Sequence, residues 1–330
     1  MGRYFIYFLT FLIISISDSF ASSLDITYRN TGVSFGNSKR LNGIRLNFID
    51  NQVEKINGFN FTFWKPKENP DAVMNGFVFG LVAPNAKEIN GLALGGVAVV
   101  GENINGVSFA TVGLVSEVIT GISIGGIGLA SERIGGIAMG GVGLAVDNLD
   151  GIAVGGVGLA SGKINGIALG GIGLASESIK GIAIGGVGLA VERMDGIAVG
   201  GVGVAAEAIN GIAIGGVGLA SETIKGISFG GIGVASEKIT GITVGGIGVG
   251  ASDITGLTIG GVKLQSENLT GLSIGGLCRV KSNLSGVSIG ILNLAHKLNG
   301  VQIGILNYCG NNPKFLRLLP IINVHINRKQ

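Results

Sequence analysis

The sequence has few of the residues from which catalytic and nucleic-acid-binding sites are built. Of its 330 residues, 2 are His, 2 are Cys, 5 are Pro and 13% are charged. The two histidines, His296 and His325, lie near the C-terminus and leave no Ser/His/Asp or Cys/His set to argue for. Lys and Arg total 23 against 20 Asp and Glu, spread along the chain, which indicates no nucleic-acid footprint. We therefore expect a protein that is not an enzyme, has no cofactor and binds no nucleic acid.

Glycine, in contrast, is abundant, and this excludes further classes. The 63 glycines are far above the usual ~7%, but the proline content and Gly-X-Y period of collagen are missing. The many Ile, Val and Leu residues disfavour disorder. A helical fold is also disfavoured, because each Gly in a helix costs about 1 kcal/mol relative to Ala and no stretch of the central region is free of Gly.

The first 21 residues have the pattern of a secretory signal peptide. Arg3 precedes an apolar run from Tyr4 to Ile16, and the small residues Ser19 and Ala21 flank a Phe. An N-terminal membrane anchor is the weaker alternative, because the run is shorter than the ~20 residues that a membrane span needs. We predict cleavage after Ala21 and export of the remaining chain.

A 15-residue unit recurs along most of the chain, which indicates a repeat architecture. Looser copies begin at Gly43, Gly58 and Gly76, and a last copy begins at Gly300. The regular copies begin at Gly91, Gly106, Gly121, Gly136, Gly151, Gly166, Gly181, Gly196, Gly211, Gly226, Gly241, Gly256, Gly271 and Gly286. We divide the chain into a signal peptide (1–21), an N-terminal cap with irregular repeats (22–90), a regular repeat region (91–306) and a C-terminal cap (307–330).

Each unit contains two short alternating segments. In the unit that begins at Gly181, Ile182 and Ile184 alternate with Ala183, and apolar residues again alternate around Gly188. Alternation predicts short strands with one apolar face, and the double Gly between them suits a corner. A unit this small cannot bury its own apolar face, so neighbouring units must stack. We predict an all-β fold, a β-solenoid of 15-residue turns, with the large aliphatic residues inward.

This orientation leaves the small alternating residues outside. The outward Ala residues form a flat, nearly bare surface, and we expect lateral self-association or surface attachment there rather than a pocket for a small molecule. The predicted interaction face consists of Ala153, Ala168, Ala183, Ala198 and Ala213.

A transmembrane β-barrel is the alternative fold, and an integral outer-membrane channel is the alternative function. In the barrel, each unit forms one long strand whose large apolar residues face lipid. The mature chain lacks the required aromatic girdles, because Tyr28, Trp64 and Tyr308 are its only interfacial aromatics. In each repeat the apolar residues change sides of the strand at the double Gly, so half of them would point into the lumen of the barrel. The solenoid is therefore favoured, and membrane association stays open.

An acidic residue recurs at the twelfth position of most units, and stacking would make it a ladder. A carboxylate every ~5 Å either repels its neighbours or shares cations, so a row of weak Ca²⁺ sites is conceivable. Basic residues in the same turns, such as Lys180, Arg193 and Lys225, offer a simpler compensation, and we assign no metal site. The candidate ladder consists of Glu177, Glu192, Glu207, Glu222 and Glu237.

Two irregularities lie near the C-terminus. Arg279 falls where the repeat predicts an inward side chain, and a buried unpaired Arg would be costly, so we expect a bulge or rotation that brings it to solvent. Cys278 occupies a predicted outward position and Cys309 a corner about two turns away, so we expect no disulfide between them.

The repeats and the C-terminal segment GVQIGILNYCGNNPKFLRLLPIINV resemble bacterial surface-repeat proteins of the leptospiral type. The residues that carry the resemblance are Gly300, Gln302, Gly304, Asn307 and Tyr308, followed by Leu319, Pro320 and Asn323. The resemblance implies an exported protein of the bacterial cell surface or outer envelope, and it implies no functional residues. We therefore expect a structural or adhesive cell-surface element.

Overall fold

The computed structural model describes residues 23–326, so the predicted signal peptide (1–21) lies outside the described residues. Between these limits the chain forms strands and one short 3-10 helix, η1 (Lys314–Leu316). The chain divides into two compact units, Met1–Ala160 and Ser161–Gln330, and the division falls inside the predicted regular region.

The first unit is a stack of parallel strands closed at its start by a hairpin. Its strands are β1 (Ser23–Tyr28), β2 (Thr31–Gly36), β3 (Arg40–Asn47), β4 (Lys55–Thr62), β5 (Val73–Gly80), β6 (Asn85–Gly95), β7 (Ala98–Ala110), β8 (Gly113–Gly125), β9 (Gly128–Gly140) and β10 (Gly143–Gly155). β1 pairs antiparallel with β2. From β2 to β10, each strand pairs in parallel with the next.

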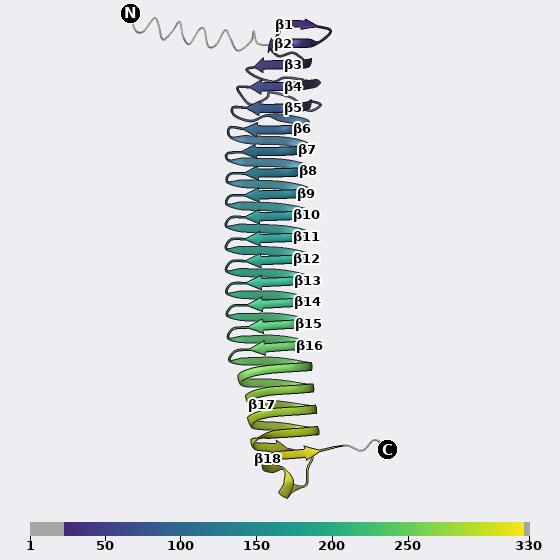
Figure 1. The fold of residues 1–330 in the computed structure, drawn as a ribbon, viewed down its shortest axis with the longest axis vertical. Coiled ribbons are helices and arrows are strands. Elements are labelled where there is room, and N and C mark those ends of the chain that lie inside the picture. Colours follow the sequence, from purple (N-terminus) through teal and green to yellow (C-terminus); the bar gives the residue numbers. More distant parts are fainter. Residues whose placement is uncertain (1–22, 327–330) are drawn as a thin grey trace, which may run out of the picture. The chain divides into compact units, whose positions relative to one another are not determined.

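The second unit repeats this pattern and closes with an antiparallel strand. Its strands after β11 (Gly158–Gly170) are β12 (Gly173–Gly185), β13 (Gly188–Gly200), β14 (Gly203–Gly215), β15 (Gly218–Gly230), β16 (Gly233–Gly245), β17 (Gly248–Cys309) and β18 (Leu318–His325). Consecutive strands from β12 to β17 pair in parallel, β17 continues through several coils, and β18 pairs antiparallel with its end (Figure 1).

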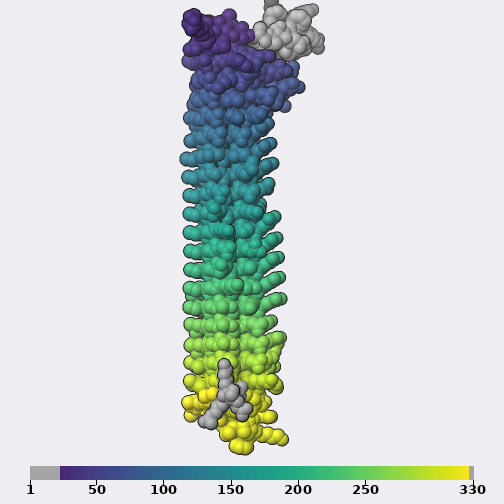
Figure 2. Space-filling view, turned by 90° about the vertical axis from the view of Figure 1, so that its right-hand side faces the viewer, coloured from purple at the N-terminus to yellow at the C-terminus, as the bar shows by residue number. Residues whose placement is uncertain are grey.

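The register of these pairings defines the fold. Ile197 pairs with Ile212, and Gly200 with Gly215, so each residue lies beside its equivalent in the next repeat. Figure 2 shows the coils of each unit as repeating rows of atoms. The chain is a β-solenoid of 15-residue coils, as predicted. The described residues stack as parallel coils and do not form the alternative transmembrane β-barrel.

The first five residues of each coil, however, face opposite to the prediction. Ala183 is 0% exposed, whereas Ile182 and Ile184 on either side are 36% and 39% exposed. The predicted interaction face of outward Ala residues is therefore wrong, because its members Ala153, Ala168, Ala183, Ala198 and Ala213 are all completely buried. Further along the coil, Leu189 is buried as predicted, but Val187 at the bend is exposed.

The Ala residues face inward because the coil is narrow at its bend. A Cβ atom added to Gly185 would lie 2.1 Å from the carbonyl oxygen of Gly188, so the two sides of the coil are almost in backbone contact there. The inward position equivalent to Ala183 holds small residues in the regular coils, either Ala or, as at Ser228 and Thr243, a buried hydroxyl residue. Larger residues such as Leu189 and Met194, 2% and 0% exposed, fill the wider end of the interior. Side-chain size would normally place Ile inside and Ala outside, but the spacing of the two sides reverses this order.

The first residue of each coil must be Gly for a different reason. Gly196 has a φ of 134°, which L residues with a side chain rarely adopt. A Cβ atom there would also lie 2.1 Å from the carbonyl oxygen of Gly181 in the neighbouring coil. Gly188 differs, because a Cβ atom added to it would meet nothing within 4 Å.

The first unit contains a buried ion pair near its start. Arg45 occupies the inward position that Ala, Ser or Thr holds in the regular coils. Its Nη1 donates to Oδ1 of Asp50 over 2.6 Å, and both side chains are 0% exposed. The guanidinium also donates to Oδ1 of Asn60 and of Asn37. Amide partners supply further hydrogen bonds to this buried charge pair, while Nε of Arg45 is buried without a hydrogen-bond partner. This inward position thus holds charged and amide groups near the start of the unit, where the regular coils hold Ala, Ser or Thr.

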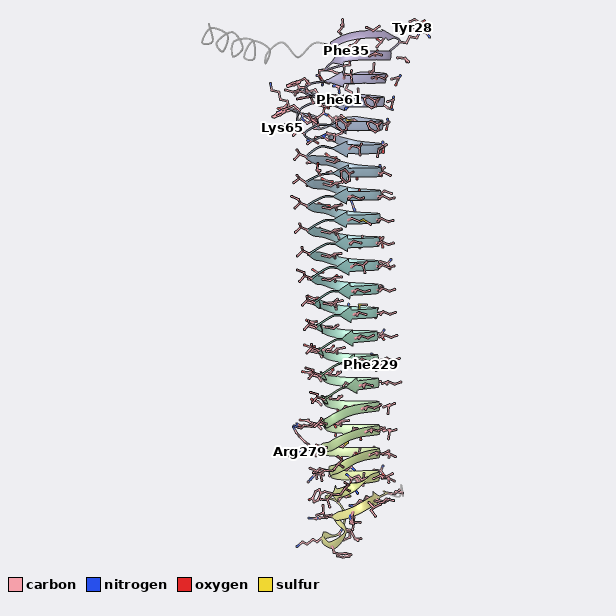
Figure 3. The ribbon with its side chains drawn as sticks, turned by 60° about the vertical axis from the view of Figure 1, so that its left-hand side comes forward. Tyr28, Phe35, Phe61, Lys65, Phe229 and Arg279 are labelled. Atoms are coloured by element: carbon pink, nitrogen blue, oxygen red, sulfur yellow. The ribbon has the colours of Figure 1, made fainter. Side chains whose placement is uncertain are left out.

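In the last coils of the second unit the alternation shifts by one residue. Cys278 is 1% exposed, so its predicted outward position is wrong. Arg279 is exposed, as the expected local rotation requires, and Val280 is buried (Figure 3). The shift is accommodated because the backbone across the bend is farther away here. A Cβ atom added to Gly275 would lie 2.5 Å from the carbonyl oxygen of Gly260 in the neighbouring coil, but its nearest contact across its own coil would be Sγ of Cys278, at 3.5 Å. A larger residue at this position therefore fits inside.

The two kinds of glycine predict different costs of substitution. We expect Gly196→Ala to lower the free energy of unfolding by about 2–4 kcal/mol, because it adds both backbone strain and a clash with the adjacent coil. Gly188→Ala should change it by no more than about 0.5 kcal/mol, because the added methyl group meets open space. Chemical denaturation of both variants measures the difference. Equal destabilisation by the two substitutions would contradict the different backbone surroundings assigned to Gly196 and Gly188.

Candidate functional site

The most extensive feature of the surface is an apolar one. It consists of the second and fourth residues of each coil, counted from its first Gly, such as Ile182 and Ile184 in the coil from Gly181. We call these positions the aliphatic face and consider it separately in each unit. From the coil at Gly43 to that at Gly300, every residue of this face is Ile, Val, Leu, Met or Phe. All of them are half-buried or exposed.

In-register stacking turns these residues into continuous columns. Ile182 pairs with Ile197, and Ile197 with Ile212. Where the face contains Phe, the rings stack: the centroids of Phe59 and Phe77 are 4.9 Å apart with an interplanar angle of 3°. Figure 3 shows the side chains of successive coils, Phe229 among them, projecting in the same direction. The result is a row of identical apolar strips at the strand spacing of about 4.8 Å.

An asparagine ladder follows the aliphatic face in the first unit. These residues stand immediately before the first Gly of their coils, and each side chain donates to the amide oxygen of its neighbour in the preceding coil over 2.6–2.8 Å. The members are Asn42, Asn57, Asn75, Asn90 and Asn105. This ladder was not predicted above, although the recurrence of Asn at the repeat spacing could have indicated it.

The charged residues lie in the other part of the coil. The acidic ladder residues Glu177, Glu192, Glu207, Glu222 and Glu237 are all exposed. Bases such as Lys180 and Arg193 are exposed in the same turns. Among the described residues no three His, Cys, Asp or Glu side chains come together as a metal site. The structure thus aligns the ladder residues along one part of successive coils.

Serine residues hold the backbone that carries these acids. Oγ of Ser116 donates to the carbonyl oxygen of Glu102 in the preceding coil over 3.0 Å and to that of Val118 in its own coil over 2.9 Å. Ser131 makes the equivalent bonds to Glu117 and Arg133. The bend at each acidic residue is thus fixed between adjacent coils.

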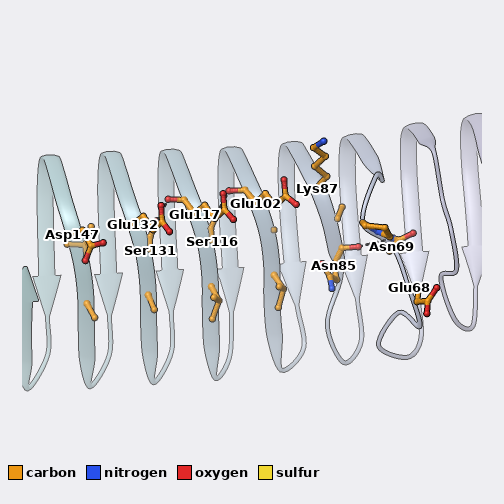
Figure 4. A pocket seen from close by; sticks show the side chains of 18 residues that line it. Glu68, Asn69, Asn85, Lys87, Glu102, Ser116, Glu117, Ser131, Glu132 and Asp147 are labelled. Atoms are coloured by element: carbon orange, nitrogen blue, oxygen red, sulfur yellow. Dashed lines mark hydrogen bonds between the residues drawn. The ribbon is translucent and has the colours of Figure 1, made fainter.

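A shallow groove runs beside the acidic row in each unit, where the sequence analysis expected no pocket. In the first unit it has a volume of about 820 Å³, and small residues such as Ala130 and Ala145 line it together with Glu117, Glu132 and Asp147 (Figure 4). A groove of about 950 Å³ in the second unit repeats this lining. The signal in the sequence was the outward Ala two residues before most of the acids, which leaves space that a larger residue would fill.

The residues singled out near the C-terminus do not form a site together. Cys278 and Cys309 are both free and buried, and burial raises the pKa of each thiol. His296 is exposed, whereas Nδ1 of His325 lies 2.7 Å from Oδ1 of Asn312 in the C-terminal cap.

Comparison with protein-family models, with curated proteins and with solved structures finds no match to this chain. The resemblance to leptospiral-type surface repeats therefore stays a prediction. Within the described residues, no helix is long and apolar enough to cross a membrane.

The reversed orientation can be tested by placing a charge on each side of the strand. Ala183→Asp should lower the free energy of unfolding by about 3 kcal/mol or more, because a carboxylate enters a dry, narrow interior. Ile184→Asp is the matched control and should cost less than about 1 kcal/mol, since the residue is already 39% exposed. Thermal unfolding followed by circular dichroism ranks the two variants. The opposite ranking would show that the aliphatic face is the core.

The burial of the thiols predicts low reactivity. We expect iodoacetamide at pH 8 to modify Cys278 and Cys309 far more slowly in the folded protein than in urea, because the side chains are 1% and 0% exposed and the raised pKa keeps them protonated. Mass spectrometry of timed samples measures both rates. Modification of the folded protein at the unfolded rate would contradict this placement.

Proposed function

We propose that this protein is an exported, non-enzymatic repeat protein that acts as a structural or adhesive element of the bacterial cell surface. The observation that carries the proposal is the distribution of its surface residues. Within each unit, one part of every coil presents only apolar side chains, and another part presents the charged ones. A large, contiguous apolar surface is typical of an interaction site rather than of a small-molecule site.

Three further arguments support the proposal. The predicted signal peptide (1–21) implies export. The resemblance of the C-terminal segment to leptospiral-type surface repeats implies the cell envelope. The repeat architecture itself favours binding over chemistry, because stacked coils of uniform length present one extended, repetitive surface. The channel hypothesis is not proposed, since it depended on a different arrangement of strands.

Surface labelling of intact cells tests the location. The exposed lysines Lys180, Lys225 and Lys238 should react with a membrane-impermeant amine reagent while the cells are whole. A cytoplasmic protein and a periplasmic protein of the same cell serve as controls and should stay unlabelled. If these lysines react only after the cells are broken, the surface location is wrong.

A further inference from the structure

The aliphatic face of the second unit is large enough for a specific protein interface. Its coils begin at Gly166, Gly181, Gly196, Gly211, Gly226, Gly241, Gly256, Gly271, Gly286 and Gly300, ten in all. Five residues at about 3.3 Å each, repeated over these coils at about 4.8 Å, cover roughly 800 Å². Stable interfaces of standard size bury about 800 Å² per partner. This unit alone therefore presents the area that a stable dimer needs.

The spacing of the face indicates what kind of surface fits it. Ile182, Ile197 and Ile212 stand in register, so ridges of aliphatic side chains alternate with furrows at the strand spacing. A partner that fills many furrows at once must carry ridges of the same spacing. A second copy of this chain has this surface, and two identical faces can pair by a two-fold rotation, each inserting its side chains between those of the other.

The charge distribution favours a protein partner over a lipid surface. Helices that lie on membranes combine an apolar face with a polar face rich in Lys and Arg. Here the polar part of the coils mixes signs: Glu192 is followed by Arg193, and Glu237 by Lys238. In the coils from Gly166 to Gly241 the polar part therefore carries both signs of charge rather than the uniformly positive surface that would attract anionic headgroups. Bases predominate only from Lys263 onward.

The end of the second unit is closed, which directs association to its side. β18 covers the last coil by antiparallel pairing. Pro320 within β18 is exposed and has no N–H to donate to a further strand. Growth by adding a strand at this end is therefore impeded, whereas the aliphatic face stays accessible.

We infer that two copies of this protein associate face to face through the aliphatic face of the second unit, with a dry interface of interdigitated Ile, Val, Leu and Phe side chains. The inference deepens the proposed function by naming a second copy of this chain as the partner. It rests on the proposed function only for the place where pairing occurs, the cell surface. The pairing itself is a property of the purified protein, so its failure and a wrong cellular location are separate outcomes.

The test compares assembly of the exported protein with that of two variants. Ile184, Ile214 and Phe229, 39%, 39% and 43% exposed, are replaced together by Lys in the face variant. The matched control, Ala190→Lys with Ala220→Lys and Ala235→Lys, adds the same charge at exposed positions of the polar part of the same coils. Circular dichroism confirms that both variants are folded. Sedimentation velocity measures the mass of each protein at about 10 μM. This concentration exceeds the micromolar dissociation constants of the weakest interfaces of this size.

We expect twice the mass of one chain for the native protein and the control, and the mass of one chain for the face variant. A native protein that sediments as a single chain, or a face variant with the native mass, overturns the inference. Flotation with phosphatidylcholine vesicles examines the competing partner. A native protein that is a single chain in buffer and binds these vesicles, with the face variant unable to bind, would assign the face to lipid.

A cross-linking scan locates the interface. Cys is placed in turn at successive positions of the face, namely Ile182, Ile197, Ile212, Ile227 and Ile242, and a short bis-maleimide is added because paired sheets lie about 10 Å apart. At least one position near the two-fold axis should yield a covalent dimer. Cys at Ala205 in the polar part should yield none. A dimer that cross-links only through Ala205 would place the interface elsewhere and overturn the inference.

Discussion

The close approach of the two sides of the coil at its bend is the constraint on which the rest of this structure depends. At Gly185 and Gly188 the backbones are too near for any side chain between them. The interior therefore holds small residues, Gly, Ala, Ser or Thr, at this end and reaches full width only around residues such as Leu189 and Met194. Because the strand alternates, filling the interior with Ala183 places Ile182 and Ile184 on the surface. A packing requirement inside the coil thus creates an apolar surface outside it.

Stacking in register explains how so thin a core is stable. Each coil places a residue directly beside its equivalent in the next coil, so favourable pairs recur: Ser228 with Thr243, Asn75 with Asn90, and Phe59 with Phe77. Cross-strand pairs of this kind stabilise a sheet by roughly 0.2–1 kcal/mol each. Within each unit, parallel backbone pairing joins each coil to the next. Many small, repeated contributions replace the single large core of a globular domain.

The ends of the repeat depart from this scheme. Near the start of the first unit, the inward position is taken by Arg45, and the core becomes a network of charge and amide. In the last coils of the second unit, the bend opens, Cys278 turns inward and Arg279 turns outward. The first coils of the first unit and the last coils of the second unit adjoin the caps. Their polar or irregular interiors limit the stacking of further coils. The proposed interactions therefore depend on the regular coils, and the caps determine where those coils stop.

The sequence by itself determined the repeat length, the strands, the corners and the stacking of coils into a β-solenoid, because periodicity and the positions of Gly are local properties that one coil already displays. It also located the acidic ladder and the irregularity at Arg279. It did not determine which side of each strand faces inward. Alternation of Ile182, Ala183 and Ile184 separates two sides but does not orient them, and hydropathy favoured the wrong side. Only the tertiary structure decided this, because the inward side is chosen by the distance between the two sides of the coil, which depends on how residues far along the turn pack together.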